Sequence, residues 1–425
     1  MISTDRVATT EFGLRTSAAF ELRPEDHPRE WPWYSPETVD RIAELTARGR
    51  VFDYGHGPEI AELESAFATA HGRRFAVAAN SGTSALFEAF HGLNLQPGDE
   101  VVVPTFTFLA SASPLLLLGA VPVLADAGDA AGNVTADTLA AALTRRTAAI
   151  VVTHLFGEPV DIGPIVALAR REGLALVEDC SHAHGAHYAD GRPVGTAGDV
   201  AVYSIGAHKT VTGGLGGVLL TDDEDIHDNA VLLGSFKQRS RLTIARPEVR
   251  ALADIGLGGN LRISPPAALL AAAHLAELEE IVAVKQRNAS RLESVLTGFA
   301  GVRAVPTAPQ ADRGGRYGVH VELDPAVSRA DALARLTARG LLVSPPQTQL
   351  LHRSSLFQGV RPPRQLYSEH VWRRAFAYRH HDFPVASGLH DRWVALPATR
   401  LHGDADRMID DYAEIWGQVW AEMGL

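Results

Sequence analysis

Seven short apolar runs follow one another between Phe75 and Thr221, and amphipathic stretches separate most of them. They read F-A-V-A-A-N (75–80), E-V-V-V-P (100–104), V-P-V-L-A-D (121–126), A-A-I-V-V-T-H-L (148–155), L-A-L-V-E-D (174–179), V-A-V-Y-S (200–204) and G-V-L-L-T (217–221). Buried strands of a parallel sheet are almost continuously apolar, and the helices that cover such a sheet are amphipathic. The rhythm therefore predicts an α/β protein whose mostly parallel, seven-stranded sheet is covered by helices.

The pattern changes beyond this region and predicts a second, smaller domain. Residues 260–296 read as a long helix, in which glutamates precede the Lys and Arg positions. After it, Y-G-V-H-V-E-L (317–323) and a final helix from Ala405 to Met423 indicate an α+β unit. We expect an N-terminal arm and helix over residues 1–70, a large domain over 71–285 and a small C-terminal domain over 286–425.

Charge and composition narrow the class of partner. The 425 residues include 39 Lys and Arg against 50 Asp and Glu, a formal charge of -11, which argues against binding to nucleic acid or to a membrane surface and favours a small molecule. The single cysteine, Cys180, allows neither a disulfide within the chain nor a cysteine-rich zinc site. No signal-like segment or membrane-spanning run is present, so we expect a cytoplasmic protein.

The chain has only three lysines, at positions 209, 237 and 285. Lys209 lies in V-Y-S-I-G-A-H-K-T-V-T-G-G-L-G-G-V (202–218), an apolar, glycine-rich turn between two strands. A lysine in a site that disfavours its charge becomes a nucleophile towards aldehydes. Lys237 and Lys285 stand among charged residues, and we predict that both are solvated or ion-paired. The glycines match neither G-x-G-x-x-G nor a Walker loop, which argues against nucleotide binding here.

An aspartate and two histidines follow the fifth apolar run, in V-E-D-C-S-H-A-H-G-A (177–186). Asp179 ends the strand, and the carboxyl edge of a parallel sheet is where α/β proteins bind ligands. A carboxylate there can hold a proton on a ring nitrogen of a cofactor. The alternatives are structural roles for His182 and His184, or a metal bound by the three side chains. The spacing is not that of a helical metal motif and a third carboxylate is missing, so we predict no metal site.

The segment N-S-G-T-S-A-L (80–86) follows the first apolar run and opens a helix. A helix N-terminus with a glycine and hydroxyls offers free backbone N–H groups to an anion such as phosphate, although an ordinary N-cap would have the same residues. Pyridoxal 5'-phosphate (PLP) requires a bound phosphate, a protonated pyridine nitrogen and an aldehyde held as an imine. The order and spacing of this helix start, Asp179 and Lys209 match these three requirements.

These stretches resemble the fold type I PLP enzymes and, among them, the sugar and cyclitol aminotransferases of the DegT/StrS type. The resemblance runs from about residue 30 to the C-terminus and is strongest between 75 and 275. The matching segments are S-G-T-S-A-L (81–86), P-G-D-E-V-V-V-P-T-F-T-F-L-A-S-A-S (97–113), T-H-L-F-G-E-P (153–159), V-E-D-C-S-H-A-H-G-A (177–186), Y-S-I-G-A-H-K-T-V-T-G-G-L-G-G (203–217) and G-N-L-R-I-S-P-P-A-A-L-L (259–270).

The resemblance implies a role for each matching residue. Lys209 forms the imine with the cofactor aldehyde, and Asp179 pairs with the pyridine nitrogen. The phosphate is held by Gly82, Thr83 and Ser204. Both the cofactor and the reaction, a transamination, follow from this resemblance.

Three further positions complete the implied site. Phe108 stacks on the cofactor ring, and His182 stands where the family has Gln or His near that ring. Asn260 matches an asparagine that reaches the phosphate in the neighbouring subunit's site, so a homodimer is implied. His352 and Arg353 lie in the segment 344–357 that should border the pocket, and we consider them candidates for binding the substrate.

The resemblance implies that the substrate is a keto-cyclitol or a keto-sugar, and we expect glutamate or glutamine as the amino donor. Nucleotide-sugar members commonly carry His-Tyr-Pro where this chain reads S-P-P-Q-T-Q-L-L-H-R-S-S-L-F (344–357). The segment resembles instead the branch with cyclitol aminotransferases and 3-amino-5-hydroxybenzoate synthase, as in secondary-metabolite biosynthesis. Two alternatives remain: a PLP-dependent dehydratase or aromatising lyase, and a non-catalytic PLP-binding sensor. The arginines between 361 and 381 we expect to form a solvated face with salt bridges.

Overall fold

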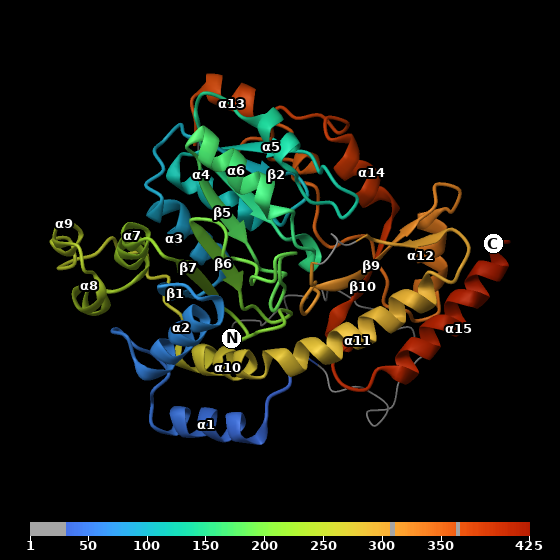
Figure 1. The fold of residues 1–425 in the computed structure, drawn as a ribbon, viewed down its shortest axis with the longest axis horizontal. Helices are drawn as coiled ribbons and strands as arrows, with labels where there is room; N and C mark the ends of the chain where they lie inside the picture. Colours follow the sequence, from blue (N-terminus) through green and yellow to red (C-terminus); the bar gives the residue numbers. More distant parts are fainter. Residues whose placement is uncertain (1–30, 307–310, 363–365) are drawn as a thin grey trace, which may run out of the picture.

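The computed structural model describes residues 31–306, 311–362 and 366–425, which form a seven-stranded and a three-stranded sheet with covering helices (Figure 1). The strand order of the large sheet is β1-β7-β6-β5-β4-β2-β3, and only β7 runs against its neighbours. The predicted α/β fold with a mostly parallel sheet is confirmed. The strands are β1 Phe75–Ala79, β2 Glu100–Pro104, β3 Val121–Ala125, β4 Thr147–Thr153, β5 Ala175–Asp179, β6 Val200–Ser204 and β7 Gly217–Thr221.

Helices cover both faces of this sheet because side chains along each strand alternate between two buried clusters. In β1, Val77 and Ala79 face one cluster and Ala76 and Ala78 the other. The first cluster is covered by α3 Gly82–Gly92, α4 Ser113–Leu118 and α7 Glu224–Gly234, and the second by α2 Pro58–His71, α5 Ala136–Ala142, α6 Ile162–Glu172 and α10 Pro265–Ala276.

Three parallel strands end together and define the edge that matters for function. Thr153 at the end of β4 pairs with Asp179 of β5, and Asp179 pairs with Val202 of β6. Parallel pairing in register brings the carboxyl ends of these strands to one edge of the sheet, the place at which open α/β sheets bind ligands.

The smaller sheet has the order β10-β9-β8 and carries its own core. Its strands are β8 Val302–Ala304, β9 Gly318–Leu323 and β10 Trp393–Pro397, and it packs with α11 Leu278–Leu296, α12 Arg329–Ala338 and α15 Asp406–Glu422. The helical pattern predicted over 260–296 is two helices, α10 and α11, which change over at Glu277. Helix α11 continues through residue 285, the predicted boundary between the large and the small domain. The domain limits predicted from the sequence stay a prediction.

One segment of the C-terminal part packs on the large sheet instead. Residues 350–362 and 366–389, which include η4 Leu351–Arg353, α13 Glu369–Ala375 and the start of α14 Pro384–Arg392, contribute to the first buried cluster. The hydroxyl of Tyr378 accepts a hydrogen bond from Leu124 N at 3.0 Å, and that of Tyr367 donates to Ala120 O at 2.5 Å. Figure 1 accordingly shows α13 beyond the large sheet, far from α15.

The remaining helices accompany the large sheet. They are α1 Pro36–Ala47, α8 Lys237–Thr243 and α9 Pro247–Arg250, with short helical turns at η2 Leu109–Ser111 and η3 Leu155–Gly157. A further turn, η5 Ala398–Arg400, follows β10 and contacts β9 of the smaller sheet. The predicted arm over 1–70 is described only from residue 31; its first thirty residues lie outside the described part. Within the described ranges, no helix has the length and apolar character needed to span a membrane.

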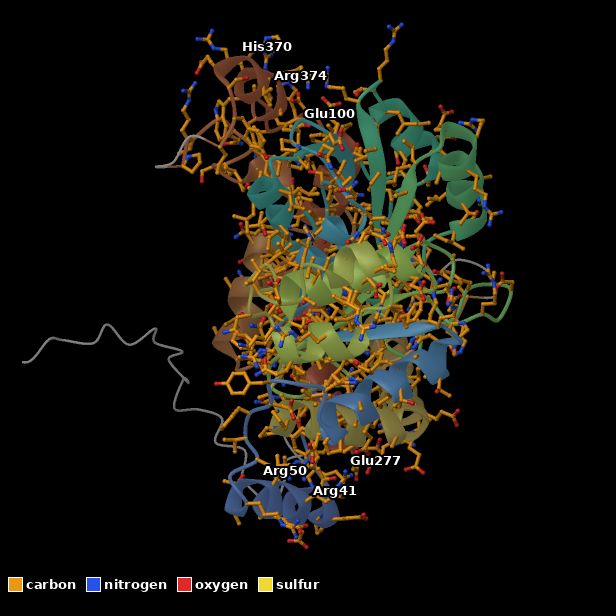
Figure 2. The ribbon with its side chains drawn as sticks, turned by 90° about the vertical axis from the view of Figure 1, so that its left-hand side faces the viewer. Arg41, Arg50, Glu100, Glu277, His370 and Arg374 are labelled. Atoms are coloured by element: carbon orange, nitrogen blue, oxygen red, sulfur yellow. The ribbon has the colours of Figure 1, made fainter. Side chains whose placement is uncertain are left out.

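The described arginines of the segment expected to form a solvated face are exposed, and Arg364 lies outside the described residues. Arg361 and Arg373 pair with Glu369, and Arg374 pairs with Glu100. Figure 2 shows Arg374 and Glu100 together near one end of the molecule, with His370 beside them. These ion pairs are located away from the sheet edge described above, and the predicted solvated face with salt bridges is confirmed for the described residues.

We predict that Trp416→Ala lowers the free energy of unfolding by about 3–5 kcal/mol, because Trp416 is fully buried in the core of the smaller sheet and its removal leaves a cavity. Denaturant unfolding followed by circular dichroism measures the change. Gln418→Ala, at an exposed position of the same helix, is the matched control and should change stability little. Equal losses in both variants would contradict the assigned core.

Candidate active site

A cavity of about 340 Å³ opens at the carboxyl ends of β4, β5 and β6. Its walls come from the N-terminus of α3, from the loops after three strands, and from residues 317 and 347–348 beside the smaller sheet. Seven of the residues predicted from the sequence line this one cavity, namely Gly82, Thr83, Phe108, Asp179, His182, Ser204 and Lys209. The roles implied for them stay predictions; their proximity is observed.

The start of α3 forms one end of the cavity. Ser81 is the N-cap, and its hydroxyl accepts a hydrogen bond from Ser84 N at 3.0 Å. The first backbone N–H groups of a helix have no partner within the helix, so they are available to an anion. A side chain at Gly82 would begin 2.8 Å from the Cβ of Ser204, so only glycine allows this close approach. Gly82, Thr83 and Ser204 thus border one space that can accept a phosphate.

Asp179 lies at the end of β5 and is 4% exposed. Its Oδ2 accepts a hydrogen bond from Ser111 Oγ at 2.6 Å, and its Oδ1 accepts one from Ser181 N at 3.2 Å. These two bonds fix the carboxylate in place. Because each carboxylate oxygen accepts about two hydrogen bonds, Asp179 can still accept a proton-bearing ring nitrogen from within the cavity.

Lys209 is partly buried in the loop between β6 and β7. Burial lowers the pKa of its amine from 10.5 to about 8, and the negative charge of Asp179 opposes this shift. A lysine with such a pKa is neutral in a substantial fraction of molecules at mildly alkaline pH, which an amine requires to attack an aldehyde.

Three aromatic rings form a stack in the wall of the cavity. The ring centres of His182 and Tyr317 are 4.0 Å apart, and the two ring planes are nearly parallel. The ring of Phe156 is stacked with that of His182, with a distance of 5.8 Å between the ring centres. The Nζ of Lys209 lies 4.1 Å from the centre of the Tyr317 ring. Burial lowers the pKa of His182 well below its usual value, and its Nδ1 accepts a hydrogen bond from Phe156 N at 3.3 Å. His182 is therefore a neutral ring that carries its proton on Nε2.

The segment that follows Lys209 is held by the N-terminal part of the chain. Trp31 Nε1 donates to Lys209 O at 2.8 Å, and Tyr34 OH donates to Thr212 O at 2.9 Å. His274 of α10 lies between the rings of Trp31 and Tyr34, and its Nδ1 accepts from Thr212 N. Residues 31–34 therefore support the lysine loop of their own chain.

Asn260 does not line the cavity. It is exposed, has a φ of 51°, and its Oδ1 accepts hydrogen bonds from Nε and Nη2 of Arg262 at 3.0 and 2.7 Å. Since a guanidinium only donates, the amide NH2 of Asn260 is left free to donate elsewhere. The structure describes one chain, so the implied contact of Asn260 with a second subunit stays a prediction.

His352 and Arg353 lie outside the cavity as well. His352 is buried, with its Nδ1 2.7 Å from Thr105 Oγ1, and Arg353 forms two bonds to Asp391. The segment 344–357 does border the cavity, as expected, but through Gln347 and Thr348. Since neither His352 nor Arg353 lines the cavity, the structure gives no support for direct contact between these residues and a substrate.

The sequence did not indicate that Tyr317 lines the cavity, and it suggested the wrong environment for Lys285. Tyr317 was noted only as the start of a strand, and nothing in the sequence says that its ring turns towards Lys209. Lys285, expected to be solvated or ion-paired, is 2% exposed and bonds to Thr210 Oγ1 and Arg316 O. That expectation was wrong because Lys285 lies on the buried face of α11.

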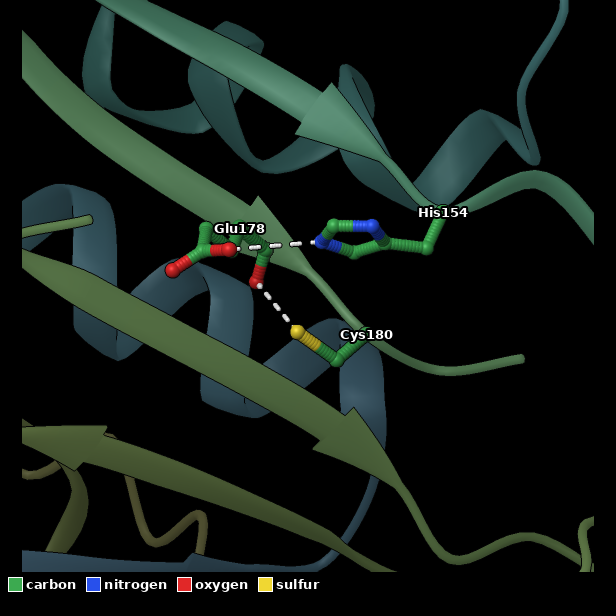
Figure 3. A group of neighbouring side chains, drawn as sticks. All are labelled: His154, Glu178 and Cys180. Atoms are coloured by element: carbon green, nitrogen blue, oxygen red, sulfur yellow. Dashed lines mark hydrogen bonds and ion pairs between the residues drawn. The ribbon is translucent and has the colours of Figure 1, made fainter. Parts of the chain in front are cut away.

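His154, Glu178 and Cys180 form a cluster of possible metal ligands beneath the sheet edge (Figure 3). His154 Nδ1 accepts from Val160 N at 3.2 Å, so the proton on Nε2 points to Glu178 Oε2 at 3.3 Å. Glu178 Oε1 accepts from Gly198 N at 2.6 Å, and burial raises the pKa of the Cys180 thiol well above its usual value. These atoms are already hydrogen-bonded or protonated, so the cluster is a structural network; the absence of a metal site stays a prediction.

The cavity fits PLP in its donor set. The free N–H groups of α3 suit a phosphate, the fixed carboxylate of Asp179 suits a protonated ring nitrogen, and the amine of Lys209 suits an aldehyde. The fold and this site define a fold type I PLP-dependent enzyme. The chain belongs to the DegT/DnrJ/EryC1/StrS aminotransferase family, whose model matches residues 36–409, and it is a PLP-dependent aminotransferase.

Proteins of known activity resemble the chain over most of its length. It is 31% identical over 403 residues to an L-glutamine:2-deoxy-scyllo-inosose aminotransferase of Streptoalloteichus tenebrarius, covering 91% of this chain and 94% of that protein. It is 30% identical over 419 residues to an L-glutamine:scyllo-inosose aminotransferase of Streptomyces griseus, covering 96% and 98%. The crystal structure of a 3-amino-5-hydroxybenzoic acid synthase superimposes with a TM-score of 0.78 at 27% identity, covering 93% of this chain and 99% of that one.

We predict that Glu178 gives the protein part of its stability above pH 4.5 and that this part is lost as the pH falls towards 2. The pKa of Glu178 is lowered from 4.5 to about 2, mainly because hydrogen bonds from His154, Tyr188 and Gly198 outweigh burial. A carboxyl whose pKa is lower in the folded protein stabilises it where the carboxyl is ionised, here by on the order of 3 kcal/mol. Glu178→Gln should therefore be less stable at pH 7 and lack this acid-dependent loss.

Denaturant unfolding at a series of pH values measures both effects. Glu172→Gln, the same change at an exposed position, is the control and should follow the wild-type curve. A Glu178→Gln variant with the stability and acid profile of the wild type would show that the network contributes nothing.

Proposed function

We propose that the protein transfers the amino group of glutamine or glutamate to the keto group of a cyclitol or sugar. The observation that carries the proposal is that Lys209, Asp179 and the N-terminus of α3 line one cavity. The similarity to L-glutamine:scyllo-inosose and L-glutamine:2-deoxy-scyllo-inosose aminotransferases supports both the donor and a cyclic polyol ketone as acceptor.

Different residues of the cavity would bind the cofactor and support its chemistry. Gly82, Thr83 and Ser204 would hold the phosphate of PLP, and Asp179 would keep its ring nitrogen protonated. When bound, PLP supplies an aldehyde that captures amines and a ring that withdraws electrons from the carbon bearing the amine. Asp179 supports that withdrawal because its carboxylate stabilises the positive charge on the ring nitrogen.

Lys209 would have two roles. Its amine would hold the aldehyde of the cofactor, and it would move the proton between the donor's Cα and the cofactor. Burial lowers the pKa of this amine to about 8, which favours the neutral form that can accept a proton. The ring of Tyr317, with its centre 4.1 Å from Lys209 Nζ, would cover one side of the amine.

His182 and the small-domain wall would orient the reactants. With Nδ1 accepting from Phe156 N, the neutral ring of His182 offers an N–H donor at Nε2. Gln347 and Thr348 add an amide and a hydroxyl on the other side. Hydroxyl groups of a cyclitol or sugar can pair with such donors and acceptors without a charged partner.

We further propose a homodimer in which Asn260 acts in the partner's site. Large apolar side chains are exposed near Asn260 in sequence, including Leu252, Ile255 and Leu257, with Leu242 on α8. Apolar side chains gathered in one stretch of surface are typical of protein–protein interfaces. The free NH2 of Asn260 is a suitable donor to a phosphate.

The second candidate is a dehydratase or aromatising lyase on a related precursor. The structural similarity to 3-amino-5-hydroxybenzoic acid synthase supports it. The presence of Lys209 favours transamination, and the complete set of Lys209, Asp179 and α3 is more than a PLP sensor would need.

We predict that wild-type protein with PLP shows the absorbance band of a protonated imine and that L-glutamine or L-glutamate converts it to the band of pyridoxamine phosphate. Lys209→Ala should lose the first band and turnover, because no other described lysine reaches the cavity. Asp179→Asn should keep the imine band but turn over at least about a hundredfold more slowly, since the ring nitrogen loses its anionic partner. Lys237→Ala, at an exposed lysine, is the control.

Product analysis separates the two candidates. Mass spectrometry of the product from a keto-cyclitol should show exchange of the keto oxygen for an amine, dependent on the amino donor. Loss of water from the substrate without a donor would replace transamination by the dehydratase reaction, and a protein that forms no imine with PLP would contradict the whole proposal.

We predict that mixing two inactive variants restores activity. In a mixed dimer of Lys209→Ala and Asn260→Ala subunits, one site has both Lys209 and the partner's Asn260, so random pairing should restore about a quarter of wild-type turnover. If Asn260 acts in its own subunit, both sites of the mixed dimer remain defective and no activity returns. Mixing Lys209→Ala with Asp179→Asn, which affect one and the same site, is the control and should restore none.

A further inference from the structure

Lys285 is a buried amine that the proposed reaction does not use. Its side chain is 2% exposed, and its Nζ lies 3.0 Å from Thr210 Oγ1 and 3.1 Å from Arg316 O. The hydroxyl of Thr210 gives its own proton to Gly315 O at 3.3 Å, so Lys285 must be the donor in both of its bonds. Neither acceptor is a carboxylate.

The two acceptors are the chain neighbours of two residues that line the cavity, Lys209 and Tyr317. Thr210 directly follows Lys209, and Arg316 directly precedes Tyr317, whose ring centre lies 4.1 Å from Lys209 Nζ. One amine on α11 therefore joins the segment of the reactive lysine to the segment of the ring that covers it. The bond from Thr210 to Gly315 reinforces the same junction.

The turn that precedes Tyr317 is tightly constrained. Arg316 has a φ of 34°, in a region that non-glycine residues seldom adopt. A Cβ at Gly315 would lie 2.5 Å from the side chain of Thr210. A strained turn persists where its surroundings over-determine it, and the bond from Lys285 to Arg316 O is one of the contacts that do so.

Lys285 is a costly way to fill this space. Burial lowers the pKa of its amine from 10.5 to about 7, which means that the folded protein disfavours the charged form. An apolar side chain of similar length would fill the same volume without this desolvation cost. Such a side chain could not donate hydrogen bonds to Thr210 Oγ1 and Arg316 O.

We infer that Lys285 is a positioning residue of the transamination: its amine ties Thr210 to Arg316 and so holds the Tyr317 ring against Lys209. The inference rests on Lys209 being the reactive lysine of the proposed function. Without this tie, the Tyr317 segment and the Lys209 segment separate more easily, and water reaches Lys209 Nζ. Better solvation of that amine favours its charged form, which does not attack an aldehyde.

The titratable groups around Lys285 do not complicate its test. Burial, with a smaller contribution from the charge of Lys285, lowers the pKa of His184, in the loop after β5, to about 3 and that of His402, before α15, to about 2. Both rings stay neutral from pH 6 upwards. Arg316 is paired with Glu293 at 3.2 Å and stays charged.

The experiment is a titration of Lys209 in the cofactor-free protein carrying Lys285→Met. The rate at which an acylating reagent labels Lys209 is followed against pH by peptide mass spectrometry, which is tractable because the chain has three lysines. We expect the pKa of Lys209 to rise by about one unit, because entry of water favours the ammonium form. The PLP-loaded variant should show a fall in kcat of the first half-reaction greater than any change in KM for the donor.

Two controls separate positioning from general destabilisation. Leu292→Ala removes a buried side chain from the same helix without touching Lys209 or Thr210, and Lys237→Met makes the same substitution at an exposed lysine. Both should leave the pKa of Lys209 unchanged. If Lys285→Met does not fold, Thr210→Val, which removes the acceptor, should raise the pKa of Lys209, whereas Thr210→Ser should not.

The pKa of Lys209 in these variants decides whether Lys285 has the inferred role. An unchanged pKa of Lys209 in Lys285→Met or, where that variant does not fold, in Thr210→Val overturns the inference, and so does an equal rise in Leu292→Ala. The titration needs no cofactor, so its outcome is independent of whether wild-type protein forms an imine with PLP. Failure of imine formation would contradict the proposed function. An unchanged pKa of Lys209 would contradict only the role of Lys285.

Discussion

The parallel pairing of β4, β5 and β6 is the constraint on which the site depends. It brings Thr153 and Asp179 to one edge, and the loop after β6 then carries Lys209 back over that edge. The antiparallel β7 closes the loop, so that a strand on each side anchors the segment that carries Lys209. The N–H groups at the start of α3, the fixed carboxylate of Asp179 and the Lys209 amine of lowered pKa meet because the sheet has this order.

Much of this arrangement could be predicted from sequence because it follows from local pattern. Continuous apolar runs give parallel strands, a residue at the end of such a run lies at the ligand-binding edge, and a glycine and hydroxyls after a strand open a helix. Gly82, Asp179 and Lys209 were found in this way. Each is located by its own element and by the order of strands, without knowledge of how the two sheets pack.

What could not be predicted depends on contacts between distant segments. Tyr317 reaches Lys209 only because the smaller sheet packs beside the large one, and Lys285 looks exposed in a charged helix until the opposite face of that helix is buried. His352 was predicted to face the pocket from its place in a loop, yet in that loop Gln347 and Thr348 do so. Side-chain direction within irregular segments is set by tertiary packing, which local periodicity does not record.

The stack of rings beneath the lysine loop joins parts of the chain that are made at very different times. Tyr34, His274, Trp31 and His402 lie one upon another, and the first three of them bond to the backbone of the segment that begins at Lys209. During synthesis, His402 is made long after every strand of the large sheet and after residues 209–212, which the stack supports. The lysine loop therefore acquires its full support only after residue 402 has left the ribosome, later than the strands on either side of the loop.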